Sequence, residues 1–187
     1  MKTCRIHIFG ASGSGVTTLG RALADAFSIP HHDSDDFLWR PTKPPYRELR
    51  PVADRLRLMR EMFLDRSDWV LSGTLVGWGE PVVSFFDLAV FVETPTDVRL
   101  ARLREREARR FGAAAVSPGG WRHAETEDFI DWSSHYEDGT REGGCSRPRH
   151  ETFLAALTCQ TVRVDGREPV GALVRRVTAT VRSAQPG

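Results

Sequence analysis

The sequence lacks several features that would place it in a membrane, on nucleic acid or outside the cell. No run of about 18 apolar residues is present, so no transmembrane helix is expected. The net charge is only +1, which gives no support for a nucleic-acid surface. Three widely spaced cysteines, an odd number, indicate a reducing compartment. No apolar signal region opens the chain, because glycines interrupt it between Gly10 and Gly15. We therefore expect a cytoplasmic protein with neither membrane nor nucleic-acid partners.

What the chain does have is a glycine-rich segment between a short apolar strand and a helix. Glycines permit positive φ, so the backbone can turn sharply and aim several N–H groups at one point. The positive end of the following helix faces the same point, which favours a phosphate group. The expected phosphate-binding residues are Gly10, Ser12, Gly13, Ser14, Gly15, Val16, Thr17 and Thr18. The hydroxyl of Thr17 falls where such loops hold Mg²⁺.

One position of this loop departs from the pattern G-x-x-x-x-G-K-[ST]. The lysine is replaced by Val16, which has no ammonium group to reach the terminal phosphates. The alternative is a Gly/Ser turn without a ligand. The agreement of strand, glycine spacing, threonine pair and helix favours the phosphate loop.

Acidic residues follow the short second strand that we expect near His31. Because ligands of open α/β sheets bind at the carboxyl ends of the strands, these carboxylates face the expected crevice. Asp35 is the first choice for orienting a substrate hydroxyl, and Asp33 is the second. Holding Mg²⁺ through water is the other role open to either carboxylate. A solvated turn or a helix N-cap is the alternative.

Aromatic and basic residues beside the acidic loop suggest a substrate pocket. Trp39, Arg40 and Arg47 lie in a proline-rich segment that excludes regular structure, where rings can stack and cations can bind an anion. A packed surface loop is the alternative. Trp78, between two glycines after the third strand, can present its ring to a ligand or belong to the core. Residues 51–65 predict an amphipathic helix whose arginines, Arg55 among them, lie on a solvated side.

The second half of the chain is rich in arginine. A buried strand over residues 87–93 ends at Thr94-Pro95, and the helix that follows carries Arg102, Arg106, Arg109 and Arg110 on one face. Residues 111–147 then break the alternation of strands and helices and indicate a mobile, glycine-flanked lid. Arginines at the end of that lid are Arg141, Arg147 and Arg149. The whole chain, 1–187, is expected to be one domain with this insertion.

This order of elements resembles the adenylate-kinase-like branch of the P-loop kinases. The resemblance implies an α/β fold of three layers, αβα, with a five-stranded parallel sheet and a lid. In nucleoside monophosphate kinases an arginine pair follows the strand-end x-Pro, and Arg102 and Arg106 fall at the matching places. The resemblance implies that the first lies against adenine and the second contacts ATP phosphates.

A second resemblance is to bacterial P-loop proteins described as adenylate kinases or small-molecule kinases. They carry a G-A-S-G-S-G-[TV]-[ST]-T-L-G loop, a D-D-F-x-W-x-P segment and an L-S-G-x-x-x-G-W-G segment, all present here. The arginine-bearing loop that grips AMP in adenylate kinases is replaced by residues 72–75, Ser-Gly-Thr-Leu. AMP as the acceptor is therefore unsupported.

These features lead to one main hypothesis and two rivals. The main one is a Mg²⁺- and ATP-dependent kinase of a small molecule, in which Asp35, Arg102 and Arg106 are catalytic. The lid arginines would replace the missing loop lysine. The rivals are a nucleotide-binding sensor without activity, which Val16 and Ser72 favour, and an NTPase that needs no acceptor. The identity of the acceptor and the oligomeric state are left open.

Overall fold

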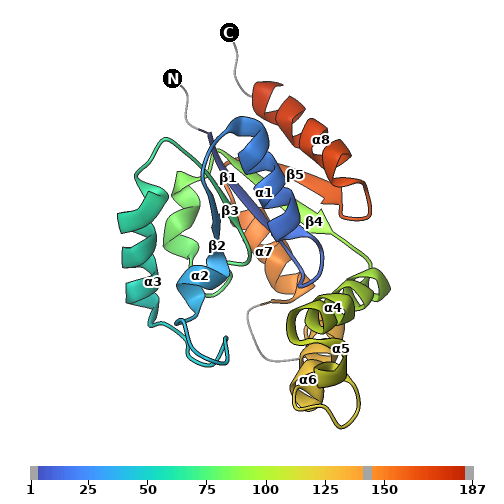
Figure 1. Cartoon of the computed structure of the whole chain (residues 1–187). Helices are drawn as coiled ribbons and strands as arrows, with labels where there is room; N and C mark the ends of the chain where they lie inside the picture. The colour runs from blue at the N-terminus through green and yellow to red at the C-terminus, as the bar shows by residue number, and fades with distance from the viewer. Residues whose placement is uncertain (1–3, 141–144, 184–187) are drawn as a thin grey trace.

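Five parallel strands form the centre of the chain, in a computed structural model that describes residues 4–140 and 145–183 (Figure 1). The strand order is β2-β3-β1-β4-β5. The strands are β1 Cys4–Gly10, β2 His31–Asp33, β3 Asp68–Ser72, β4 Leu88–Glu93 and β5 Gln160–Asp165. Every pairing is parallel, so the carboxyl ends of all strands meet at one edge. The predicted three-layer α/β fold is confirmed.

Helices cover both faces of the sheet. Helices α1 (Val16–Phe27) and α8 (Val170–Ser183) pack on one face. The other face carries α2 (Ser34–Leu38), α3 (Val52–Met59), the π-helical turn η1 (Arg60–Leu64), the 3-10 helix η2 (Glu80–Phe85) and α7 (Arg147–Ala156). Helices α4 (Thr96–Phe111), α5 (Ala113–Val116) and α6 (His123–Ser134) lie together beyond the sheet, beside the loop after β1 (Figure 1).

The alternation of side chains along β1 builds two separate cores. Ile6 and Ile8 point toward α1 and α8, where they pack with Leu23 and Val177. Phe9 points the opposite way and stacks on Phe91 at 5.0 Å between ring centroids. Since both faces of the central strands are covered, their residues are apolar almost without interruption.

The predicted lid over residues 111–147 is only partly described. Helices α5 and α6 pack against α4, and Arg141 lies outside the described residues. The division of the chain into a domain and a lid stays a prediction. No helix within residues 4–140 and 145–183 is long and apolar enough to cross a membrane.

Gly13 is the position where α4 meets the loop after β1. Its φ is +81°, and a Cβ there would lie 2.7 Å from the carbonyl oxygen of Arg99 and 3.0 Å from Leu103 Cγ. Only glycine fits both the left-handed backbone and this close approach. The first turns of α4 are therefore held against the loop.

We predict that Gly13→Ala lowers the free energy of unfolding by about 2–4 kcal/mol, because backbone strain and overpacking add. Gly119→Ala is the matched control, since Gly119 has a φ of +83° and nothing within 4 Å of its added Cβ. It should lose only the strain, about 1 kcal/mol. Urea denaturation measures both. Equal losses of unfolding free energy in the two variants would show that the close approach of α4 to the loop adds nothing to the cost of Gly13→Ala.

Candidate active site

The loop after β1 has the conformation that its glycines predict. Gly15, at φ +103°, is the left-handed residue from which α1 begins, so the amino end of that helix opens at the loop. The Ser14 amide closes a tight turn by donating to the Ala11 carbonyl at 3.0 Å. The loop lies at the carboxyl edge of the sheet, next to the ends of β2 and β3.

Thr17 and Asp33 come together at this edge. The Thr17 hydroxyl donates to Asp33 Oδ2 at 2.9 Å, and the Ser72 hydroxyl donates to the same oxygen at 3.3 Å. Asp33 Oδ1 accepts from the Asp35 amide at 3.1 Å, so this carboxylate also caps α2, as one alternative predicted. Hydroxyl and carboxylate oxygens at one point form a donor set that fits Mg²⁺.

Asp35, on the first turn of α2, faces the arginines of α4. Its side chain keeps solvent-exposed surface, yet protein crowds it from several sides. This crowding and, secondly, the neighbouring Asp33 raise its pKa to about 6, against the positive charges of Arg106 and Arg110. A carboxyl with such a pKa is ionised at neutral pH and is still a stronger base than an ordinary aspartate.

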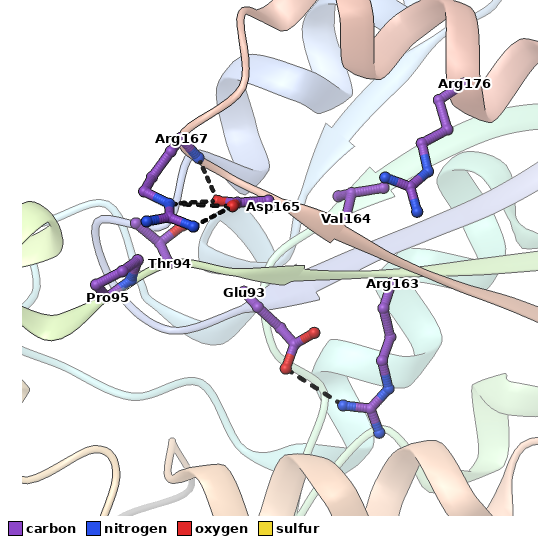
Figure 2. A pocket seen from close by; sticks show the side chains of 8 residues that line it. All are labelled: Glu93, Thr94, Pro95, Arg163, Val164, Asp165, Arg167 and Arg176. Carbon is purple, nitrogen blue, oxygen red and sulfur yellow. Dashed lines mark hydrogen bonds and ion pairs between the residues drawn. The ribbon is translucent and has the colours of Figure 1, made fainter.

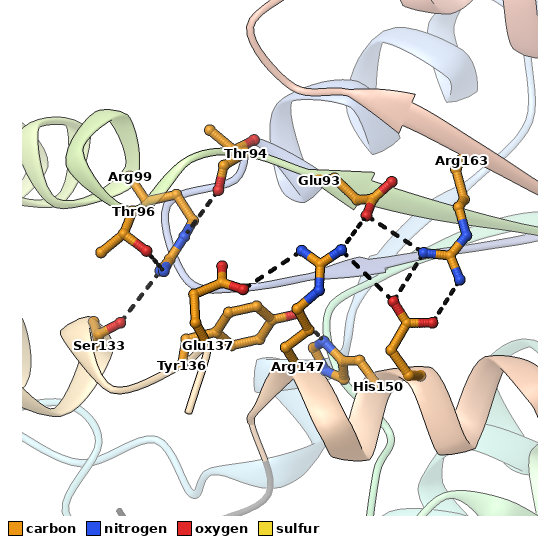
Figure 3. Close-up of polar contacts among 11 residues, drawn as sticks. Glu93, Thr94, Thr96, Arg99, Ser133, Tyr136, Glu137, Arg147, His150 and Arg163 are labelled. Atoms are coloured by element: carbon orange, nitrogen blue, oxygen red, sulfur yellow. Dashed lines mark hydrogen bonds and ion pairs between the residues drawn. The ribbon is translucent and has the colours of Figure 1, made fainter. Parts of the chain in front are cut away.

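Arg99 is the main residue of this region that the sequence did not reveal. Its side chain is fully buried and donates to the Ser12 carbonyl oxygen at 3.2 Å. It also donates to the Ser133 carbonyl oxygen at 3.3 Å (Figure 3). It also donates to the Thr94 carbonyl and the Thr96 hydroxyl, at 3.2 and 3.0 Å. Spacing alone could not separate it from the solvated arginines of α4, because burial of one helix face depends on what packs there.

Arg102 and Arg106 both lie on α4, before residue 111, rather than on the predicted lid. Arg102 bridges two segments, because it donates to the carbonyl oxygens of Ser14 at 3.4 Å and Gly166 at 3.0 Å. The guanidinium of Arg106 is half-exposed, 5.6 Å from the centroid of the Phe129 ring and 3.5 Å from Glu107 Oε1. Arg102 is therefore beside the phosphate loop already, and Arg106 is one helical turn further out.

The predicted substrate pocket is only partly brought together. Trp39 is half-buried and packs edge-on against Tyr46, and the exposed Arg40 pairs with Glu48 at 3.1 Å. Arg47 pairs with Glu125 of α6, so the proline-rich segment reaches the helices beyond the sheet. Arg40 and Arg47 therefore already have carboxylate partners, and these ion pairs hold the proline-rich segment in place.

Trp78 and Arg55 are both buried, and each burial corrects an expectation from the sequence. Trp78 does not present its ring to the crevice; it is 7% exposed and belongs to the apolar core, as the alternative held. Arg55 is not solvated but 8% exposed, with its guanidinium 5.3 Å from the Trp78 ring centroid and its Nε donating to the Arg50 carbonyl at 2.6 Å. The loop after β3 folds over α3, and that tertiary contact buries both residues.

Arg55 has no carboxylate partner among the described residues. Burial and, secondly, the nearby Arg50 lower its pKa. Buried charges in proteins are normally paired, because taking a charge out of water costs several kcal/mol. An unpaired guanidinium beside the carboxyl edge is therefore a candidate anion-binding group.

The predicted lid arginines are placed differently from one another. The Arg147 Nη2 atom lies 2.7 Å from Glu93 Oε1, and the guanidinium also pairs with Glu137 and Glu151 (Figure 3). The positive charge of Arg147 is therefore largely compensated. Arg149 reaches the loop after β3, where a Cβ on Gly77 would lie 3.7 Å from its guanidinium.

A polar pocket of about 490 Å³ lies at the ends of β4 and β5 (Figure 2). Its arginines are paired, Arg163 with Glu93 at 3.3 Å and Arg167 with Asp165 at 2.6 Å. The pocket adjoins the turn whose Gly166 carbonyl accepts from Arg102. It is thus on the side of the phosphate loop away from Asp33 and Asp35.

Solved structures with a similar arrangement include small-molecule kinases. A shikimate kinase from Acinetobacter baumannii aligns with a TM-score of 0.60 and 14% identity, over 99% of this chain and 96% of that one. A gluconokinase from Sinorhizobium meliloti 1021 aligns with a TM-score of 0.52 and 19% identity, over 97% and 94%. At these identities the likeness concerns the fold, which is that of a P-loop kinase of the nucleoside monophosphate kinase type.

Sequence relatives identify the family more closely. The uncharacterized protein YqaC of Bacillus subtilis (strain 168) is 36% identical over 172 residues, which are 92% of this chain and 94% of that protein. A cytidylate kinase of Halobacterium salinarum is 30% identical over 141 residues, 68% of this chain and 71% of that one. No family model matches the chain. The chain belongs to the family of YqaC, among the P-loop kinases related to cytidylate kinase.

We predict a pH-dependent gain of stability in Asp35→Asn. The pKa of Asp35 in the folded chain, about 6, lies above the ordinary 3.8, so the folded chain binds this proton more tightly than the unfolded chain does. The tighter proton binding stabilises the folded chain. This stabilisation is complete below pH 3.8 and is lost as the pH rises through 6. Asparagine does not ionise, so the variant should become progressively more stable than the wild type between pH 4 and 7.

Urea midpoints at four pH values in this range measure the effect. Asp128→Asn, at an exposed position of α6, is the control and should follow the wild-type curve. A constant difference between Asp35→Asn and the wild type at all four values would contradict the raised pKa.

Proposed function

We propose that the protein transfers a phosphoryl group from ATP to a small-molecule acceptor, with Mg²⁺. The observation that carries this proposal is the contact of Thr17 with Asp33, 2.9 Å apart, where the phosphate loop meets the acidic end of β2. Phosphoryl transfer depends on positioning and on neutralising charge, and both kinds of group meet at this edge.

The donor is held by the loop and by α4. The backbone amides of residues 13–17 surround the β-phosphate, as the amino end of α1 favours. Thr17 and Asp33 would hold Mg²⁺, directly or through water, and the ion would supply positive charge against the phosphates. The base of ATP lies beyond Arg102, toward the turn at Gly166 and the pocket of Figure 2.

Arginine replaces the missing loop lysine in this proposal. The sequence contains lysine only at Lys2 and Lys43. No lysine of the phosphate-binding segment can therefore take the place of the one that Val16 replaces. Arg102 is in contact with the loop, and Arg106 lies one turn away, across from Asp35. Closure of Arg106 onto the terminal phosphate would supply the charge that lysine supplies elsewhere, and such an arginine is worth about 10³-fold or more in rate.

Asp35 is the group that receives the proton of the acceptor hydroxyl. It is ionised at neutral pH, and its raised pKa makes it a better base than an ordinary aspartate. Asp33 is engaged by Thr17, Ser72 and the amide of Asp35, so it is suited to a fixed, orienting role.

Arg55 supports an acceptor that carries an anionic group. Its buried guanidinium has a donor fork free of carboxylates in the described part of the chain, beside Trp78 and the loop after β3. A carboxylate or phosphate on the acceptor would complete the pair that the protein itself omits.

A second candidate function is a nucleotide-binding sensor without activity. Val16 and Ser72 support it. Val16 stands where phosphate loops usually have a lysine, and Ser72 stands where nucleotide kinases often have an acidic residue that organises Mg²⁺. The same loop would bind nucleotide, but no acceptor would be phosphorylated.

Release of ADP from Mg-ATP separates these possibilities. The acceptors to test first are those in the names of the related proteins, shikimate, gluconate and cytidylate, followed by other small anionic metabolites. We expect acceptor-dependent ADP release that falls about 10³-fold in Arg106→Ala. Arg109→Ala, an exposed arginine of the same helix that pairs with Glu105, is the control and should keep full activity.

Two other outcomes would support the sensor or the NTPase. Thermal shift with nucleotide but no ADP release in any mixture would favour the sensor. ADP release that needs no acceptor would indicate an NTPase. Full activity in Arg106→Ala would refute the replacement of lysine by this arginine.

We predict that Arg55→Met raises KM for the acceptor about 10- to 100-fold, because a charge-assisted contact is lost. Stability should not fall, since methionine keeps the contact with Trp78 and removes an unpaired buried charge. Arg57→Met, an exposed arginine of α3 paired with Glu61 and Asp54, is the matched control. Steady-state kinetics and urea denaturation measure the two effects; an unchanged acceptor KM would argue against an anionic acceptor.

A further inference from the structure

His150 is a fully buried histidine that the proposed reaction does not use. It lies on α7, with Nδ1 2.9 Å from the Tyr136 hydroxyl and Nε2 3.0 Å from the Thr74 hydroxyl. Figure 3 shows the Tyr136 and His150 rings next to each other, below the Arg99 and Arg147 side chains. Thr74 follows the end of β3, so the histidine connects the chain after α6 with the carboxyl edge of the sheet.

The two hydrogen bonds of the His150 ring have a defined direction. Burial lowers the pKa of His150 to about 4, so at neutral pH only one ring nitrogen carries a proton. If that nitrogen were Nδ1, the Tyr136 oxygen would accept from it and the tyrosine proton would have no acceptor among the described residues. Tyr136 is 4% exposed, and a buried, unpaired O–H costs about 1–3 kcal/mol.

The other tautomer satisfies both of the buried donors, the Tyr136 O–H and the His150 N–H, and leaves only the proton of the half-buried Thr74 hydroxyl for another acceptor. The Tyr136 hydroxyl then donates to Nδ1, and Nε2–H donates to the Thr74 oxygen. The Thr74 oxygen also lies 3.4 Å from the Val76 amide, which donates to it. The Thr74 oxygen then accepts from both the His150 ring and the Val76 amide, so its own proton points away from these two partners.

Thr74 is half-buried at the edge that we assign to the acceptor. The residue before it, Gly73, is so close to α2 that a Cβ there would lie 2.0 Å from Ser34 Oγ and 3.4 Å from Asp33 Oδ1. The loop that begins at Thr74 also carries Trp78, which covers Arg55. Thr74 therefore directly follows a residue that packs against Ser34 and Asp33, and its hydroxyl proton is not used by His150.

We propose that Thr74 is a specificity-determining hydrogen-bond donor to an oxygen of the acceptor, and that His150 and Tyr136 are positioning residues that fix its direction. This inference rests on the proposed function of the same site. Such a donor selects acceptors with a carboxylate, carbonyl or hydroxyl oxygen at that place and disfavours those with an ammonium group there.

Tyr136 is also linked to the phosphate loop, through Arg99. The Arg99 guanidinium lies 4.9 Å from the centroid of the Tyr136 ring and donates to the Ser12 carbonyl. Tyr136 therefore contacts both the residue that holds the donor loop and the residue that orients Thr74. The two substrates would be positioned through one buried cluster.

The first experiment is independent of activity. Long-range ¹⁵N–¹H spectra of the ¹⁵N-labelled full chain at pH 7 report the tautomer, with the His150 signals assigned by their loss in His150→Gln. We expect a proton on Nε2 and none on Nδ1. A proton on Nδ1, or on both nitrogens, would overturn the proposal.

The second experiment uses the acceptor that supports ADP release, with shikimate, gluconate and cytidylate as the first probes. Thr74→Val should raise KM for that acceptor about 10-fold and leave KM for ATP unchanged, whereas Thr74→Ser should behave as the wild type. His150→Leu should reproduce the valine effect. His150→Gln, which keeps an N–H donor, should restore most of the affinity, a rescue that a merely structural role would not give.

An acceptor KM in Thr74→Val equal to that of the wild type would overturn the proposal. If no acceptor gives ADP, the proposed function fails, and the tautomer spectra still decide the arrangement of Tyr136, His150 and Thr74. The two failures are therefore distinguishable.

Discussion

The buried guanidinium of Arg99 is the interaction on which the candidate site depends. It contacts the phosphate loop at Ser12, the start of its own helix at Thr94 and Thr96, and the end of α6 at Ser133. All of these partners are neutral oxygens, and burial lowers the pKa of the group. A cation in the interior is tolerated only when its donors are satisfied, so these segments are held together by one residue. The close approach of α4 at Gly13 follows from the same packing.

The charges around the sheet edge fall into two groups with different consequences. Arg147 and Arg163 are matched by Glu93 and Glu151, and such partly exposed pairs contribute little more than local order. Arg55 and Arg102 have no carboxylate partner among the described residues, and their donors meet carbonyl groups or a ring instead. A phosphate-binding protein needs positive charge that its own acids do not neutralise, and these two arginines supply such charge in addition to Arg106.

The parts of the site that could be predicted are those encoded within a few neighbouring residues. The strand, glycines and helix around Gly15 are local features, and they define the loop without reference to the rest of the chain. Asp33 and Asp35 could be placed because parallel strands end at one edge. Trp78 and Arg55 could not be assigned, because each is buried by the other's segment, and helical periodicity cannot report what packs on a helix face.

The sequence by itself determined the order of strands and helices, the phosphate loop with valine in place of lysine, and the family. These are properties of short segments, since a turn or an apolar strand depends on its own residues. Tertiary structure alone decided that Arg99 is buried while Arg109 is exposed on the same helix, and that His150 connects Tyr136 with Thr74. Burial and hydrogen-bond partners depend on segments far apart in the chain, which meet only when the sheet and its helices are assembled.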